Sequence, residues 1–196
     1  MRHSFRHLWL VLFVLALAGC APSIEIPFAT VPLTTTSTPP DSTTIVDSRP
    51  RSYRDFFVVA SDQDALLTTQ WLSNNPDVEF PIARLENVDY DTSFAIVAYH
   101  GMTSTGGYSI EVRRITVHGS TMEVNVRTYR PCEQQGGLFG LVLGCPVTLM
   151  VEYPMQIVEI NYSDLPTLTG PGYTFEFFVN GRWDRTIHHL IPPGSE

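Results

Sequence analysis

The chain has 196 residues, of which 20 are acidic and 12 are basic, and its formal net charge is −8 at pH 7. Every basic residue is arginine, which excludes a Schiff-base lysine, a phosphate-loop lysine and a Ser/Lys dyad. The acidic balance disfavours nucleic acid as a partner, because an acidic surface repels phosphate. About 145 residues remain after an N-terminal leader and a Thr/Pro-rich stretch, a typical size for one domain.

Residues 1–19 have the pattern of a bacterial lipoprotein signal peptide. A short basic start precedes an apolar run of 11 residues, from Leu8 to Ala18. This run is too short to cross a bilayer, which needs about 20 residues. Leu-Ala-Gly-Cys at residues 17–20 predicts cleavage before Cys20 and a diacylglycerol on its thiol. The alternative is an ordinary secretory signal followed by an unrelated cysteine.

The predicted anchor implies a location in the cell envelope, tied by lipid to a bacterial membrane and facing away from the cytoplasm. Residues 20–50 are rich in Thr, Pro and Ser and have few apolar residues that could fill a core. This composition predicts a disordered tether that holds the domain away from the membrane.

The first predicted elements of the folded part are a strand and a short helix. The strand covers residues 54–60, and Ser61 follows it as a helix N-cap with acidic residues in the first turn. The helix is predicted over residues 62–72. Four apolar side chains recur on it at helical spacing and are predicted to face the core: Leu66, Leu67, Trp71 and Leu72.

Strands dominate the middle of the chain. Residues 94–99 are almost continuously apolar, as expected for a central strand buried on both faces. Residues 107–129 alternate apolar and polar side chains around a turn, which predicts a hairpin with one wet face. The alternation changes phase at Arg113 and Arg114, which predicts a β-bulge.

Further strands follow towards the C-terminus. Residues 147–160 supply more strand, interrupted by Pro154, which cannot donate to a ladder. Residues 174–183 predict a hairpin over a type I′ turn at Asn180 and Gly181. We therefore predict a mainly β fold, an antiparallel sandwich or rolled sheet, with one short helix near its N-terminus.

The remaining cysteines, Cys132 and Cys145, are predicted to form a disulfide. Export to an oxidising compartment favours their bridging. The loop between them is rich in glycine, and closing a loop of this length stabilises the fold by roughly 3 kcal/mol. A zinc site is disfavoured, because two thiols without a nearby histidine do not supply four ligands.

The sequence offers little for catalysis. The histidines are not spaced as metal ligands, and no Gly-x-Ser-x-Gly motif occurs. The paired acids Asp62/Asp64 and Asp89/Asp91 fit helix capping and solvated loops. We expect no enzymatic activity, no metal and no cofactor.

The loop over residues 101–108 is the candidate binding site. Two adjacent glycines and small hydroxyl side chains let another backbone come close, and an aromatic residue opens the next strand. The alternative, which the residues alone favour, is a strained connection that packs the aromatic ring. The candidate partner-binding residues are Thr105, Gly106, Gly107 and Tyr108.

Several segments together resemble the C-terminal domain of PrcB-type lipoproteins. They are residues 94–101, 105–112, 122–124 and 153–160, and Thr-Gly-Gly-Tyr at 105–108 is the most specific piece. The resemblance covers about residues 55 to 160. Such proteins are small exported lipoproteins, and the namesake is an accessory subunit of a surface protease complex. The resemblance therefore implies a non-catalytic domain whose partner is a protein, with an exported protease as the candidate.

The sequence departs from that family in two places. The stretch between Cys132 and Cys145 is longer than the usual link, and residues 161–196 lie beyond the family domain. We therefore divide the folded part into a PrcB-like β domain over residues 51–160 and a C-terminal hairpin extension over 161–196, packed on the same domain. The loop at 105–108 is also similar to a loop of chagasin-like protease inhibitors. An inhibitor and a structural envelope lipoprotein are the alternative functions.

Overall fold

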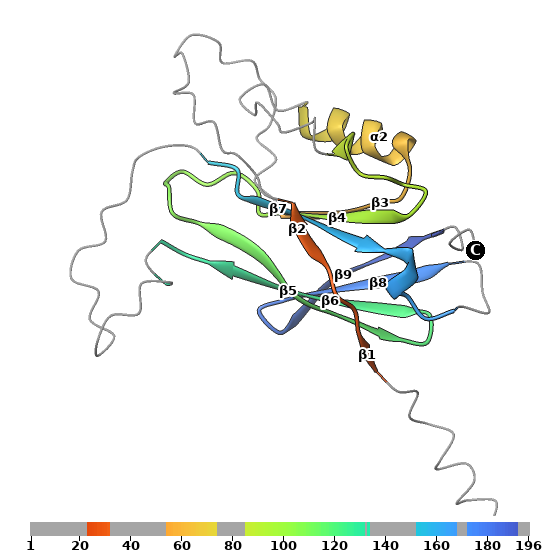
Figure 1. The fold of residues 1–196 in the computed structure, drawn as a ribbon. Helices are drawn as coiled ribbons and strands as arrows, with labels where there is room; N and C mark the ends of the chain where they lie inside the picture. The colour runs from red at the N-terminus through yellow and green to blue at the C-terminus, as the bar shows by residue number, and fades with distance from the viewer. Residues whose placement is uncertain are drawn as a thin grey trace, which may run out of the picture.

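The computed structural model describes residues 23–31, 54–73, 85–131, 133, 152–167 and 172–191. Within these residues, two β-sheets pack face to face and one helix covers the outer face of the smaller sheet (Figure 1). This arrangement confirms the predicted mainly β sandwich with one short helix. The predicted signal peptide, Cys20, Cys132 and Cys145 lie outside the described residues.

The strand order defines the two sheets. The five-stranded sheet has the order β1 (Ile24–Glu25), β5 (Ser109–His118), β6 (Thr121–Tyr129), β8 (Tyr173–Val179) and β9 (Arg182–His189). The four-stranded sheet has the order β2 (Ala29–Val31), β7 (Met155–Asn161), β4 (Ser93–Tyr99) and β3 (Asp55–Val59). Helix α2 (Asp62–Ser73) follows β3, and the 3-10 helix η2 (Tyr162–Asp164) follows β7.

One strand pair corrects the expectation of an antiparallel arrangement. Strand β8 runs parallel to β6, with Thr121 opposite Thr174 and Val126 opposite Val179. The chain leaves β6 for the other sheet, runs back along it through β7, and begins β8 at the end where β6 also begins. The two strands therefore point the same way, while every other pair of neighbours in the two described sheets is antiparallel.

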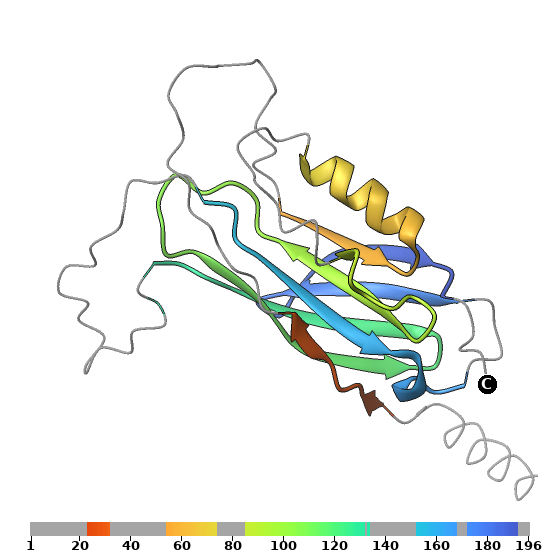
Figure 2. The ribbon, with the colours of Figure 1, turned by 45° about the horizontal axis from the view of Figure 1, so that its top comes forward.

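The prediction of a disordered tether over residues 20–50 is wrong for residues 23–31. Strand β1 pairs with β5 and β2 pairs with β7, so this segment crosses from one sheet to the other (Figure 2). Ile26 and Phe28 pack into the core between the sheets, and Val31 packs near the helix. The average composition of a Thr/Pro-rich stretch hid these few apolar residues at its start.

Local hydrogen bonds explain where helix α2 begins. The Asp64 backbone N–H donates to Ser61 Oγ at 3.1 Å, and the Ser61 hydroxyl donates to the Asp64 carboxylate at 2.8 Å. The same carboxylate accepts the Ala60 N–H at 3.2 Å. This reciprocal cap satisfies the Asp64 N–H, which the first helical turn would otherwise leave unpaired, and it confirms the predicted helix start.

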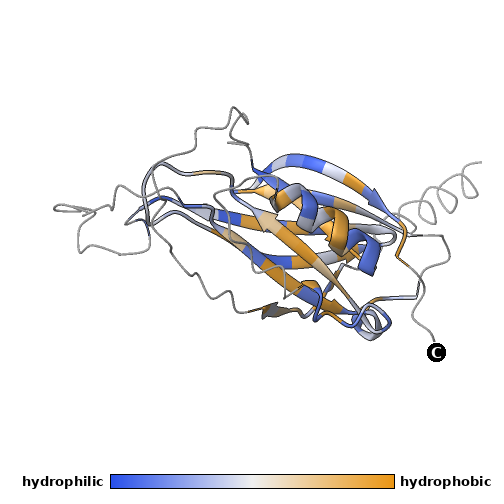
Figure 3. Cartoon of the chain, turned by 90° about the horizontal axis from the view of Figure 1, so that it is seen from above, coloured by the Kyte–Doolittle hydropathy of each residue, from blue (hydrophilic) through white to orange (hydrophobic). Residues whose placement is uncertain are grey.

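The predicted buried face of the helix is partly wrong. Leu66 and Leu67 are 50% and 53% exposed, whereas Ala65, Thr68 and Leu72 are buried. The small side chains of Ala65 and Thr68 let the helix lie close to the sheet, so the contacting stripe is narrow and excludes the two leucines. Seen from above, hydrophobic positions alternate with hydrophilic ones along the helix (Figure 3).

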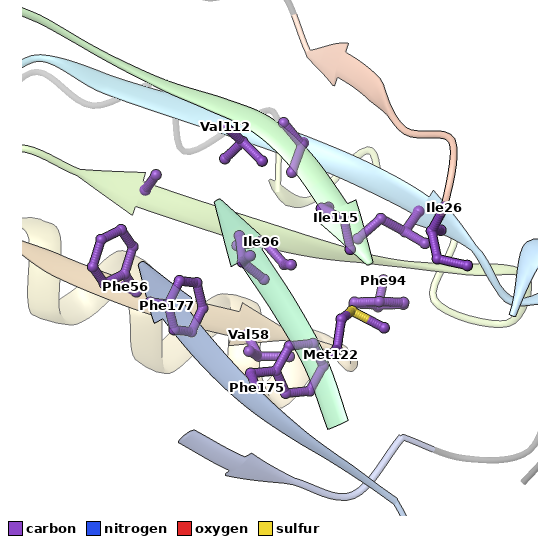
Figure 4. Close-up of a cluster of buried hydrophobic side chains, with 14 of the residues drawn as sticks. Ile26, Phe56, Val58, Phe94, Ile96, Val112, Ile115, Met122, Phe175 and Phe177 are labelled. Carbon is purple, nitrogen blue, oxygen red and sulfur yellow. The ribbon is translucent and has the colours of Figure 1, made fainter. Parts of the chain in front are cut away.

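The main core lies between the two sheets. Large side chains from both sheets meet there, among them Phe94 from β4, Met122 from β6, and Phe175 and Phe177 from β8 (Figure 4). A second cluster between the four-stranded sheet and α2 includes Val97 and Ile157. Strand β4 contributes to both clusters and is buried along its whole length, which confirms the predicted central strand.

The predicted turn and bulge are also confirmed. The register of β5 against β6 shifts between Val112 and Arg114. Asn180 and Gly181 have φ angles of 52° and 77°, as a type I′ turn requires. Pro154 comes directly before the first residue of β7, so it marks where this strand begins.

Ion pairs join the edge strands β3 and β9 on one side of the sandwich. Arg54 pairs with Asp184, and Arg185 pairs with both Asp55 and Asp184. The Arg185 guanidinium also lies 5.7 Å from the centre of the Phe56 ring. The segment that carries β1 and β2 closes the opposite side, so the apolar layer is covered at both open edges.

We expect Phe177→Ala to lower the free energy of unfolding by about 3–5 kcal/mol. Phe177 is fully buried and stacks on Phe56 with ring centres 4.4 Å apart. Because it lies in the C-terminal hairpin, the loss should appear in a single unfolding transition of the whole domain, measured by urea denaturation. Arg182→Ala, at an exposed position of the same hairpin, should change stability by less than about 0.5 kcal/mol. A separate early transition of the hairpin would contradict this expectation.

Candidate functional site

The loop over residues 101–108 joins β4 to β5 at one end of the sandwich. Tyr99, the last residue of β4, lies opposite Met155 at the start of β7. Ser109, the first residue of β5, lies opposite Tyr129 at the end of β6. The loop therefore sits where four strands of the two sheets begin or end, which we call the loop end of the sandwich.

Glu152 holds the loop at two points. Its backbone makes a two-way bridge with Thr103, with N···O distances of 2.9 and 3.1 Å, and the Thr103 hydroxyl adds a bond of 3.2 Å to the Glu152 carbonyl. Further along the loop, the Gly107 N–H donates to the Glu152 carboxylate at 3.1 Å. One residue thus fixes both halves of the loop, and a charged acceptor makes the second contact stronger than a neutral one.

Gly107 occupies a position that other residues do not easily take. Its φ angle is +89°, and a Cβ atom there would lie 3.3 Å from the Cβ of Pro131. Pro131 follows β6, so the turn after that strand packs against the loop. The glycine predicted to matter here is therefore required by the backbone conformation and by the close approach of Pro131.

The four predicted binding residues differ in exposure. Gly107 is exposed, Thr105 and Tyr108 are half-buried, and Gly106 is buried. The Tyr108 ring lies 5.6 Å from the ring of His100, between centres. A partner can reach Ser104, Thr105 and Gly107, whereas Gly106 is buried within the loop.

Three residues that shape the loop were not predicted from the sequence. Glu152 lies 45 positions from Gly107, and its role has no local signal. Neither Pro131 nor His100 is among the predicted binding residues. The two glycines are the one local signal for a tightly held loop, but they do not say which residues hold it.

His100 is a partly buried histidine at the base of the loop. Its backbone N–H donates to the Pro154 carbonyl at 2.8 Å, and its buried Nδ1 has no hydrogen-bond partner among the described residues. Burial lowers the pKa of His100 below its ordinary value of 6.5, and the positive charge of Arg54 lowers it further, against a smaller rise from the Gly101 backbone. The neutral ring is thus favoured here.

In the part of the chain that the structure describes, no three His, Cys, Asp or Glu side chains are grouped so that they could hold a metal ion. No helix of that part is both long and apolar enough to span a bilayer. The lipidation of Cys20 and the bridge between Cys132 and Cys145 fall outside these residues and stay predictions.

A comparison with protein families decides what the central strands are. The family model described as PrcB C-terminal matches residues 94–161. Residues 94–161 form a PrcB C-terminal domain. No curated protein and no solved structure matches the chain.

The PrcB C-terminal segment supplies β4 to β7 and contains the whole loop with its contacts to Pro131 and Glu152. Strands β3, β8 and β9 and helix α2 lie outside the matched range. They still complete its core, because Phe175 and Phe177 of β8 are fully buried against it. The folded unit is therefore larger than the family segment.

We expect Gly107→Ala to destabilise the protein by about 2 kcal/mol, and Gly119→Ala by about 1 kcal/mol. Both glycines have positive φ angles, but only Gly107 has a neighbour within 4 Å of the added Cβ atom. Gly119 lies in the turn between β5 and β6 and is the matched control. Urea denaturation of the two variants measures the difference. Equal losses would show that Pro131 does not restrict the loop.

We expect acid to destabilise the wild type more than the His100→Gln variant. Because the pKa of His100 is lowered in the folded state, the unfolded chain binds the proton more readily. The stabilising contribution is therefore complete above the ordinary pKa and is lost as the pH falls through the folded pKa. Unfolding free energies measured between about pH 7 and pH 5 test this difference. Identical pH slopes in the two proteins would contradict it.

Proposed function

We propose that this protein is an exported lipoprotein whose non-catalytic β domain binds a protein partner through the loop at 101–108. The observation that carries the proposal is the double attachment of this loop to Glu152. The loop is fixed at Thr103 and Gly107 while Ser104, between them, is exposed. A short segment held at both sides and open between them can meet a partner surface.

Preorganisation supports binding at this loop. A flexible loop loses conformational freedom when it binds, and this loss opposes association. The contacts to Glu152 and Pro131 restrict the loop before any partner arrives. The same contacts agree with a structural role, which crosslinking from the loop distinguishes from binding.

The family supports a protein partner over a small molecule. Residues 94–161 form a PrcB C-terminal domain, and the resemblance to PrcB-type lipoproteins implies an accessory subunit of an exported protease. The signal pattern of residues 1–20 supports export and lipidation at Cys20. In this proposal the domain stabilises or positions the protease and performs no chemistry itself.

The first test places a photo-crosslinking amino acid at Ser104 in the full-length lipoprotein in cells. Gln63, exposed on the first turn of α2, is the control position. We expect one partner to be crosslinked from Ser104 and not from Gln63. If both positions capture the same proteins, or Ser104 captures none, the loop is not the binding site.

The second test measures affinity and activity with that partner. Thr105→Arg should weaken binding by about tenfold or more, equivalent to about 1.4 kcal/mol per factor of ten, whereas Gln63→Arg should not. If the partner is a protease, an accessory subunit should preserve or raise its activity. Activity that falls in proportion to occupancy would instead identify an inhibitor that resembles chagasin. Unchanged binding by Thr105→Arg would leave the loop with a structural role.

A further inference from the structure

The folded body begins very close to the proposed lipid anchor. Only residues 21–23 separate Cys20 from Ile24, the first residue of β1. Four Cα steps span at most about 14 Å, even when the chain is fully extended. The distance from the anchor to the sheet is therefore limited by covalent length, whatever conformation these residues take.

Strand β1 cannot easily move away from the sheet to lengthen this connection. Ile24 and Glu25 lie opposite Val117 and Thr116 of β5. The Ile26 N–H donates to the Ile115 carbonyl at 2.9 Å, and the Ile26 side chain is fully buried in the core. Releasing the segment would break these bonds and expose an apolar side chain to water.

We propose that the end of the sandwich at which β1 enters rests against the lipid headgroup layer, and that the loop at 101–108 faces away from the membrane. This inference rests on the lipidation of Cys20 in the proposed function. We call this end the anchor end. Direct contact of this end with the membrane replaces the predicted role of residues 20–50, which was to act as a spacer between membrane and domain.

Strand registers show which segments share the anchor end. Val117 of β5 lies opposite Ile24, and the turn from His118 to Thr121 follows it. Thr121, the first residue of β6, lies opposite Thr174 of β8. Thr174 in turn lies opposite His188, near the end of β9. The start of β1 and the end of β9 lie at the same end of the molecule in Figures 1 and 2.

The two halves of the anchor end differ in polarity and in the number of acidic residues. In the half formed by the five-stranded sheet, Ile24 and Leu190 are 43% and 70% exposed, and Glu25 is an exposed carboxylate next to Ile24. The half formed by α2 and the four-stranded sheet carries acidic residues in its connections, and none of the described arginines lies there: Asp62, Asp64, Asp89, Asp91 and Asp164. Anionic headgroups repel these carboxylates. The half that contains Ile24 should therefore lie nearer to the lipid.

The length of the strands sets the height of the loop above the membrane. Strand β5 has 10 residues and connects the anchor end to the loop end. At about 3.3 Å per residue, the loop lies roughly 30 Å farther from the anchor end than the turn at Ser120. The loop would therefore bind its partner at a fixed distance from the membrane, because the sandwich between them is rigid.

The experiment measures how near each end lies to the lipid. The full-length lipoprotein is placed in vesicles of phosphatidylcholine and phosphatidylglycerol that contain copper-chelating headgroups, which quench fluorescence only at short range. A small fluorescent amino acid is introduced at Ser120 or at Ser104, both of which are exposed. We expect quenching at Ser120 to be several-fold stronger than at Ser104. A soluble copper chelate corrects for any difference in access from water.

A lengthened variant is the matched control. A flexible Gly/Ser segment of about twelve residues, inserted between Ala21 and Pro22, should let the body turn freely and reduce the difference between the two labels. The short connection, and not an affinity of the sandwich for lipid, would then be the cause of the orientation. A difference that persists unchanged in the lengthened variant would contradict this.

The outcomes separate this inference from the proposed function. Intact mass shows whether Cys20 carries lipid. An acylated protein with equal quenching at both labels, or stronger quenching at Ser104, overturns the orientation and leaves the proposed function standing. A chain without lipid at Cys20 overturns both the anchor and the orientation.

Discussion

The apolar layer between the two sheets is the interaction on which the rest of the structure depends. Phe94 of the four-stranded sheet meets Phe175 of the five-stranded sheet edge to face, with ring centres 6.0 Å apart, and Phe56 stacks on Phe177 at 4.4 Å. Burial of this layer supplies the main stabilisation, since its side chains leave water almost completely. Because β8 provides one ring of each pair and β3 provides Phe56, the PrcB C-terminal segment needs strands from both sides of it in the chain to become a complete sandwich.

The closure of the two open sides determines how the site is presented. On one side, ion pairs of Arg54 and Arg185 connect β3 to β9, and on the other Ile26 lies between β1 and β2. These connections link the two sheets at both open sides. The loop at 101–108 depends on how the sheets are placed, because it leaves one sheet and enters the other while Glu152, which precedes β7, holds it. A rigid scaffold beneath a small exposed loop is a common basis for recognition.

The anchor and the loop lie at opposite ends of the same strands, and this gives the two proposals a common geometry. Lipid at Cys20 would fix one end of β5 near the membrane, while the other end of β5 begins directly after Tyr108. The predicted spacer and the observed strand pairing lead to different expectations for a membrane-bound partner. A long tether would let the loop sample many heights, whereas the sandwich holds it at one.

The sequence by itself determined the features that depend on neighbours in the chain. Alternating side chains placed the β5–β6 hairpin and its bulge, Asn180 and Gly181 placed the last turn, and Ser61 placed the helix start. It also located the candidate loop, but not Glu152, which holds it. Only the tertiary structure decided the parallel pairing of β6 with β8, the strands at residues 24–25 and 29–31, and the exposure of Leu66 and Leu67. Each of these features depends on contacts between segments far apart in sequence. Local periodicity carries no information about which distant segment will pair or pack with a given element.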